Sequence, residues 1–127
     1  MRGASRGEIS KARRRSTNPM VAQLDPKEVA TRIRANPGRV VLLDVREPYE
    51  RELAVISPSL HIPMNEVSQR IDELPKDQEL VVYCHAGTRS LMVASFLEHR
   101  GFRSVGNLTG GIDAWSQTVD PHIPRYG

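Results

Sequence analysis

The sequence predicts an α/β domain with a mostly parallel central sheet and helices on both faces. Two strongly apolar runs of strand length, residues 40–45 and 79–83, are separated by segments with helical periodicity. Neither run alternates between apolar and polar residues, so we expect both faces of these strands to be buried. Parallel neighbours require crossover connections, and the intervening helical segments can supply them.

The first predicted helix begins at Pro26 and ends near Asn36. Asp25 places a capping carboxylate directly before it, and proline is favoured at the first helical position. Apolar residues then recur at helical spacing, at Val29, Ala30 and Ile33. A Pro-Gly pair ends this periodicity just before the apolar run at residues 40–45.

The middle of the chain predicts shorter elements. Residues 48–53 suit a short helix, and residues 60–62 suit a short strand. A helical stripe follows, closed by Pro75 and formed by Val67, Ile71 and Leu74.

The second half of the chain repeats the strand and helix alternation. The strand at 79–83 is followed by a helix that we expect to end at Gly101, because glycine is a frequent helix stop. Residues 105–108 are predicted to form the last strand. The pair Gly110-Gly111 then leads into a short helix.

The composition favours one domain preceded by a basic leader. A chain of 127 residues with 39% hydrophobic content can bury one core. Residues 1–19 hold six cations and one acid, so this segment carries +5 and the rest carries −2 of the total of +3. We interpret residues 1–20 as a disordered leader and residues 21–127 as the domain. Nucleic-acid binding is not expected.

Membrane insertion and export are not expected either. No apolar run approaches the roughly 20 residues of a membrane helix, and the leader lacks the apolar region of a secretory signal. We therefore predict a cytoplasmic protein. Its one cysteine cannot form an internal disulfide, so the thiol is either a buried hydrophobe or a reactive group.

The segment from Val81 to Ser90 predicts a strand, a tight turn and a helix start, with Cys84 at the beginning of the turn. Consecutive amide groups of such a turn can converge on one point, where the helix dipole adds partial positive charge. A thiol at that point is expected to react as the thiolate. Gly87 permits unusual backbone angles, and Arg89 supplies a permanent cation for an anionic substrate.

Cys84 could instead simply end a buried strand. The Gly-Thr-Arg-Ser run that follows serves no packing purpose, which favours the reactive thiol. We interpret His85 as a loop residue rather than a proton carrier. The other histidines show no metal-ligand spacing with one another or with Cys84, so neither a metal nor another cofactor is expected; they are His61, His99 and His122.

Three segments together resemble one known family. They are residues 44–50 (DVREPYE), 84–90 (CHAGTRS) and 110–115 (GGIDAW). In this order and spacing they are similar to the rhodanese-like sulfurtransferase domains, from about Leu24 to the end. Residues 119–126 further resemble the rhodanese domains attached to the adenylyltransferases of molybdopterin and thiamine biosynthesis and of tRNA thiolation. Residues 54–64 depart from the family pattern, so we expect a different loop there.

The resemblance implies a rhodanese-like fold in which Cys84 takes a sulfane sulfur from a small anionic donor such as thiosulfate and becomes a persulfide. The sulfur then passes to cyanide, a thiol or a partner protein. Arg89 would bind the anionic end of the donor. Backbone amides of the loop would stabilise the persulfide, namely those of His85, Ala86, Gly87, Thr88 and Ser90. Asp44 and Arg46 would give structural support near the site.

Other interpretations remain open. Cysteine phosphatases use a similar loop with the arginine six positions after the cysteine, where this chain has Ser90, and the shorter loop here disfavours a phosphoryl group. A non-catalytic rhodanese-like binding or sulfur-relay module is the other alternative, although binding modules commonly lack the cysteine that this chain keeps. Among the charged residues, Arg46, Glu47 and Glu50 could simply form weak surface ion pairs.

Overall fold

The computed structural model describes residues 21–127, and the predicted leader lies outside the described residues. Five strands form a parallel sheet in the order β2-β6-β5-β3-β4. The predicted α/β architecture is therefore confirmed. The strands are β2 (Ala22–Leu24), β3 (Val40–Asp44), β4 (Leu60–His61), β5 (Glu79–Tyr83) and β6 (Val105–Leu108).

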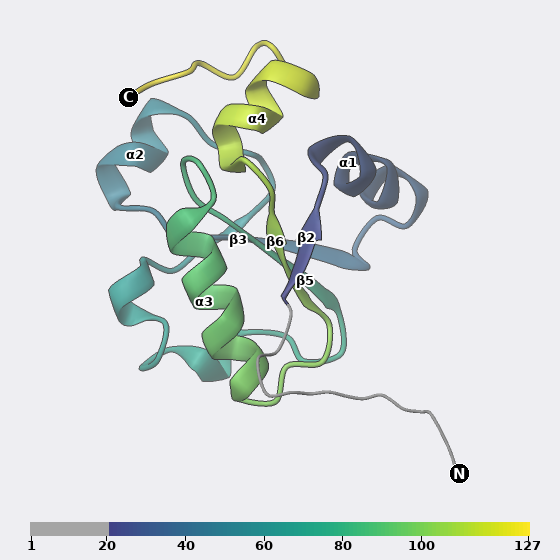
Figure 1. Cartoon of the computed structure of the whole chain (residues 1–127), viewed down its shortest axis with the longest axis vertical. Helices are drawn as coiled ribbons and strands as arrows, with labels where there is room; N and C mark the ends of the chain where they lie inside the picture. The colour runs from purple at the N-terminus through teal and green to yellow at the C-terminus, as the bar shows by residue number, and fades with distance from the viewer. Residues whose placement is uncertain (1–20) are drawn as a thin grey trace, which may run out of the picture.

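Helices cover both faces of this sheet (Figure 1). On one face α1 (Pro26–Ala35) packs against α4 (Gly111–Thr118), and on the other lies α3 (Thr88–His99). The short helix α2 (Pro48–Leu53) follows β3, and two 3-10 turns, η2 (Met64–Glu66) and η3 (Ile71–Glu73), lead to β5. Across residues 21–127, no helix combines the length and the apolar character needed to span a bilayer.

β5 is the middle strand, and its side chains enter two apolar cores in alternation. Leu80, Val82 and Cys84 pack in the core beneath α3. Val81 and Tyr83 pack in the core beneath α1 and α4. Each of the five is at most 1% exposed, which explains why this strand shows no polar alternation. The same alternation directs the Cys84 side chain to the face covered by α3.

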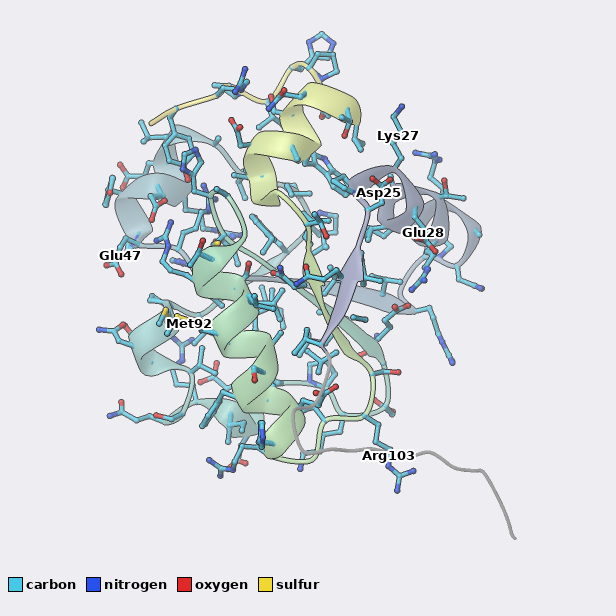
Figure 2. All side chains as sticks on the ribbon, viewed as in Figure 1. Asp25, Lys27, Glu28, Glu47, Met92 and Arg103 are labelled. Carbon is cyan, nitrogen blue, oxygen red and sulfur yellow. The ribbon has the colours of Figure 1, made fainter. Side chains whose placement is uncertain are left out.

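α1 begins where the sequence predicts. The Asp25 carboxylate accepts hydrogen bonds from the backbone N–H groups of Lys27 at 3.0 Å and Glu28 at 3.4 Å. Figure 2 shows these three residues together at the start of the helix. The bonds satisfy amide groups that have no partner inside the helix. Asn36 caps the other end, as expected.

The sequence does not predict β2. This strand has only three residues, two of them exposed, so it carries no periodic pattern. It pairs with β6, where Ala22 lies opposite Gly106. A Cβ at Gly106 would lie 2.7 Å from Leu24 Cδ1, so the glycine leaves room for the leucine side chain. The strand is therefore specified by a partner that is remote in sequence.

The α-helical stripe predicted at residues 67–74 is wrong. Within these residues only η3 (Ile71–Glu73) is helical, as a single 3-10 turn, and η2 ends before them at Glu66. Arg70, between the two turns, has φ −115° and ψ 20°, outside the helical range. Val67 and Leu74 still reach the core and are only 2% and 5% exposed. The apolar spacing thus indicates which side chains are buried, and the backbone that buries them is two short 3-10 turns instead of an α-helix.

Candidate active site

Cys84 lies at the carboxyl edge of the sheet, directly after β5. In the neighbouring strand β3, the last residue, Asp44, is in register with Tyr83. The segment 44–46 and the cysteine loop therefore share one edge of the sheet, where parallel α/β sheets usually bind their ligands.

Three hydrogen-bond donors converge on the Cys84 sulfur. The backbone N–H groups of Gly87 and Ser90 lie 3.1 and 3.4 Å from Sγ, and the Ser90 hydroxyl lies 3.3 Å away. Gly87 makes this turn possible, because its φ of 111° belongs to the left-handed region. α3 begins at the next residue, so the positive end of its dipole adjoins the sulfur. The donors suit an anion at this position.

The loop residues named from the resemblance differ in their contacts. Gly87 and Ser90 bind Sγ, whereas within the described chain His85, Ala86 and Thr88 make no hydrogen bond to it. Thr88 is the first residue of α3, where backbone amides have no partner inside the helix. Binding of a substrate anion by these amides stays a prediction.

The N-terminus of α4 holds the outer side of the loop. The N–H groups of Ile112 and Asp113 donate to the carbonyl oxygens of Cys84 at 2.9 Å and His85 at 3.1 Å. This approach requires Gly111, because a Cβ there would lie 2.4 Å from the His85 carbonyl oxygen. The glycine pair that begins the third motif therefore helps to orient two peptide groups of the cysteine loop.

A hydrogen-bond network behind the loop, with two buried residues, Ser90 and Asn107, was not predicted from the sequence. The Ser90 hydroxyl lies 2.5 Å from Asn107 Oδ1, so its single proton is shared between this acceptor and Sγ. Asn107 Nδ2 in turn donates to Gln23 Oε1 at 3.0 Å and to the Gly87 carbonyl oxygen at 3.3 Å. The available signal was a lone asparagine inside the otherwise apolar strand β6.

Arg89 is paired with a carboxylate inside the protein. Its Nη1 and Nη2 donate to the two carboxylate oxygens of Glu50 at 2.7 and 2.9 Å. The guanidinium keeps further N–H donors beyond these two, and the side chain is 34% exposed. A role in binding a donor anion stays a prediction, and the structure shows which residue orients the side chain.

Glu50 is 3% exposed, so its interpretation as a surface ion pair is wrong. Besides Arg89, it binds the Glu47 backbone N–H at 3.0 Å and the Tyr126 hydroxyl at 2.8 Å. The hydrogen bonds from Arg89 outweigh burial and lower the pKa of Glu50 to about 2. A capping box between Glu47 and Glu50 at the start of α2 places the carboxylate.

The surface interpretation is also wrong for Arg46, which is fully buried. Its guanidinium donates to both carboxylate oxygens of Asp44 at 2.8 Å and to the Ala54 carbonyl oxygen at 2.7 Å. Burial raises the pKa of Asp44, but the hydrogen bonds from Arg46 outweigh it and hold the pKa below its usual range. The two residues expected to support the site thus form a buried ion pair beside it.

Glu50→Gln should lower the free energy of unfolding by about 2 kcal/mol at pH 7. A folded pKa of about 2 against an ordinary 4.5 corresponds to roughly 3 kcal/mol, reduced by solvent screening at Arg89. Because the folded pKa is depressed, this stabilisation is complete above pH 4.5 and is lost as the pH falls toward 2. The difference between wild type and variant should therefore shrink over that window.

Urea unfolding at several pH values, followed through the fluorescence of the single tryptophan, Trp115, measures this difference. Glu52→Gln is the matched control, because Glu52 is an exposed acid of the same helix. If the wild type exceeds Glu50→Gln in free energy of unfolding by the same amount from pH 7 to pH 2, the lowered pKa of Glu50 is contradicted.

His85 contacts the C-terminal end of the chain. Its ring stacks on Tyr126 with centroids 4.3 Å apart and planes 24° apart. This packing agrees with a structural role in the loop. In the part of the chain that the structure describes, no group of three or more His, Cys, Asp or Glu side chains is arranged to hold a metal ion.

The chain is similar to known proteins. The Rhodanese-like domain family matches residues 25–118. The chain is 37% identical over 108 residues to a sulfurtransferase of Allochromatium vinosum, covering 85% of this chain and 100% of that protein. It is 34% identical over 93 residues to the adenylyltransferase and sulfurtransferase MOCS3-2 of Zea mays, covering 68% of this chain but only 19% of that protein.

The fold is shared as well. The rhodanese-related protein of Thermoplasma volcanium has a TM-score of 0.72 and 27% identity, covering 83% of this chain and 99% of its own. The Zea mays relative also confirms the resemblance to rhodanese domains joined to adenylyltransferases. The family match contains the end of β3, the cysteine loop and the glycine pair of α4, and the chain therefore belongs to the rhodanese-like domain family.

Proposed function

We propose that the protein is a sulfurtransferase that carries sulfur on Cys84 as a persulfide. The observation that carries this proposal is the convergence of donors from Gly87 and Ser90 on Sγ. Such fixed donors stabilise an anionic sulfur where a thiolate or persulfide would lie. The sulfurtransferase names of the Allochromatium vinosum and Zea mays relatives support the reaction class.

In the first step, the Cys84 thiolate attacks the sulfane sulfur of a donor such as thiosulfate. A new S–S bond forms at Cys84, the S–S bond of thiosulfate breaks, and sulfite leaves with the electron pair. In the second step, cyanide or a thiolate attacks the outer persulfide sulfur and restores the Cys84 thiolate. The chain has no second cysteine, so the acceptor comes from outside, as a small molecule or a partner protein. A thiol kept reduced for this chemistry suits the cytoplasm.

Intact-mass analysis after thiosulfate treatment, combined with an assay for thiocyanate formation, tests the proposal. The expected result is a gain of one sulfur atom in the mass of the intact chain, whose one cysteine is Cys84, together with turnover. A mass gain without turnover would indicate a relay whose acceptor is a protein. The absence of both signals would favour the non-catalytic binding module. Hydrolysis of an aryl phosphate that depends on Cys84 would favour a phosphatase.

Arg89→Ala should raise the KM for thiosulfate about ten-fold or more and change kcat less. The variant removes the cation proposed to bind the anionic end of the donor, while Cys84 and its amide donors remain. Steady-state kinetics with varied thiosulfate measures the effect. Arg70→Ala is the matched control, because that arginine is also paired with carboxylates, those of Glu66 and Glu73, but in a different segment of the chain.

The Arg89 variant also leaves Glu50 without its cation, which could itself disturb the loop. The double variant Glu50→Gln/Arg89→Ala removes this unpaired charge. We expect its KM to stay as high as that of Arg89→Ala. A KM that returns to the wild-type value would contradict direct binding of the donor by Arg89.

A further inference from the structure

The C-terminal tail, residues 119–127, returns from α4 to the active site. Figure 1 shows it running from the end of α4 to a position above α2. The Ser116 hydroxyl lies 2.5 Å from the Ile123 carbonyl oxygen, and Arg125 binds Asp113 at 2.8 Å. Ile123 and Tyr126 pack against the core beneath α1 and α4. Contacts along its length thus determine the course of this tail.

Tyr126 inserts its hydroxyl between two charged groups of the site. The hydroxyl accepts a hydrogen bond from Arg46 Nη1 at 2.9 Å and donates one to Glu50 Oε2 at 2.8 Å. Burial raises the pKa of Tyr126 to about 12, so the hydroxyl keeps its proton. A carboxylate can only accept, and the direction of the bond to Glu50 is therefore fixed.

The same carboxylate orients Arg89. Glu50 Oε2 accepts from both Tyr126 and Arg89, and Oε1 accepts from Arg89 and from the Glu47 backbone N–H. A bidentate pair holds the guanidinium in the plane of the carboxylate, so the orientation of Glu50 sets that of Arg89. The hydroxyl of Tyr126 and the Glu47 amide are the groups that fix the carboxylate on its other sides.

We propose that Tyr126 is a positioning residue of the active site, which acts through Glu50 to hold Arg89 in the orientation that receives the anionic end of the sulfur donor. This inference rests on the proposed function and deepens it, because it assigns donor affinity to the C-terminal tail. It extends the site beyond residues 25–118, where the family match ends.

Tyr126→Phe separates this role from simple packing. The variant keeps the ring that stacks on His85 and loses only the hydroxyl. We expect the KM for thiosulfate to rise about three- to ten-fold with kcat within about two-fold, as for the loss of one hydrogen bond that acts on substrate binding. Tyr49→Phe is the matched control: it makes the same chemical change on α2, at a residue that is 65% exposed, and should leave KM unchanged.

A second readout does not depend on sulfur transfer. Cys84 is the only cysteine, so its alkylation by iodoacetate, which is anionic, and by iodoacetamide, which is neutral, can be followed by intact mass. Each reagent forms a C–S bond and releases iodide. A well-placed Arg89 favours only the anionic reagent, so Tyr126→Phe should lower the ratio of the iodoacetate rate to the iodoacetamide rate about three-fold.

The outcomes distinguish the two proposals. A raised KM and a lowered rate ratio in Tyr126→Phe, with neither in Tyr49→Phe, support the positioning role. An unchanged KM with an unchanged ratio overturns it. Equal losses of both alkylation rates also overturn it, because they indicate a general structural role. If the wild-type protein transfers no sulfur, the proposed function fails while the rate ratio still decides the role of Tyr126.

Discussion

A Cys84→Ser variant should keep its fold and lose sulfur transfer by at least about a thousand-fold. The serine hydroxyl can accept the same backbone hydrogen bonds from Gly87 and Ser90 that the thiol accepts. An unionised hydroxyl is a poor nucleophile toward sulfur, however, and the chain has no second cysteine to replace it. Thiocyanate formation from thiosulfate and cyanide measures the loss, and intact mass should show no added sulfur.

The fold of this variant is tested separately. Cys84 is 1% exposed in the core beneath α3, and serine is slightly smaller and more polar, so the free energy of unfolding should fall by no more than about 1–2 kcal/mol. Cys84→Ala, which cannot accept the amide bonds, should be equally inactive. Activity retained by both variants would place the reacting group elsewhere in the protein and end the persulfide proposal.

The parts of the fold that could be predicted from sequence have local causes. β3 and β5 are buried on both faces, and a few consecutive apolar residues in the sequence are enough to predict this. The start of α1 follows from Asp25, which lies beside the amides that it caps. The cysteine loop is local in the same sense, since Gly87 and Ser90 lie within six positions of Cys84.

The surroundings of the loop could not be predicted, because the topology brings them together. Glu50 binds Arg89 across 39 positions and Tyr126 across 76. In the sequence, Glu50 resembles any acid on a short exposed helix. None of its sequence neighbours indicates that the C-terminal tail covers it. β2 was missed for the same reason, because its pairing depends on space left by Gly106 in β6.

Arg46 shows how far a local interpretation can mislead. Within the DVREPYE segment, Arg46 stands close to two acids, Glu47 and Glu50, which suggested weak surface ion pairs. The edge of the sheet is instead covered by α2, by the loop that follows it and by the tail, so the guanidinium is enclosed and bonded to Asp44, Ala54 and Tyr126. The prediction with the largest effect on stability follows from this enclosure.

Arg46→Met should lower the free energy of unfolding by about 3–5 kcal/mol, because it removes one partner of a buried ion pair. Asp44 would keep only Arg51 at 3.1 Å as a charged partner, and the Ala54 carbonyl oxygen would lose its donor. Domains of this size are stable by about 5–15 kcal/mol in total. Urea unfolding followed through Trp115 should therefore show a large shift of the midpoint.

Arg70→Met is the matched control for this measurement. Arg70 also binds two carboxylates, Glu66 and Glu73, each at 2.9 Å, but its side chain is 36% exposed. Exposed ion pairs contribute little, so this variant should unfold close to the wild-type midpoint. Equal shifts of the urea midpoint in Arg46→Met and Arg70→Met would show that burial of the ion pair does not determine the loss of stability.

The double variant Asp44→Asn/Arg46→Met separates the cost of an unpaired buried charge from the role of Arg46 beside the active site. Removing both charges should restore much of the stability lost in Arg46→Met. Arg46→Met also removes the Nη1 donor that holds the Tyr126 hydroxyl toward Glu50, so its KM for thiosulfate should be raised. The double variant still lacks this donor, and its KM should stay raised. A KM that recovers together with stability would mean that the buried pair supports the fold alone. A KM that stays high while stability returns would place Arg46 in the same chain of contacts as Tyr126, Glu50 and Arg89.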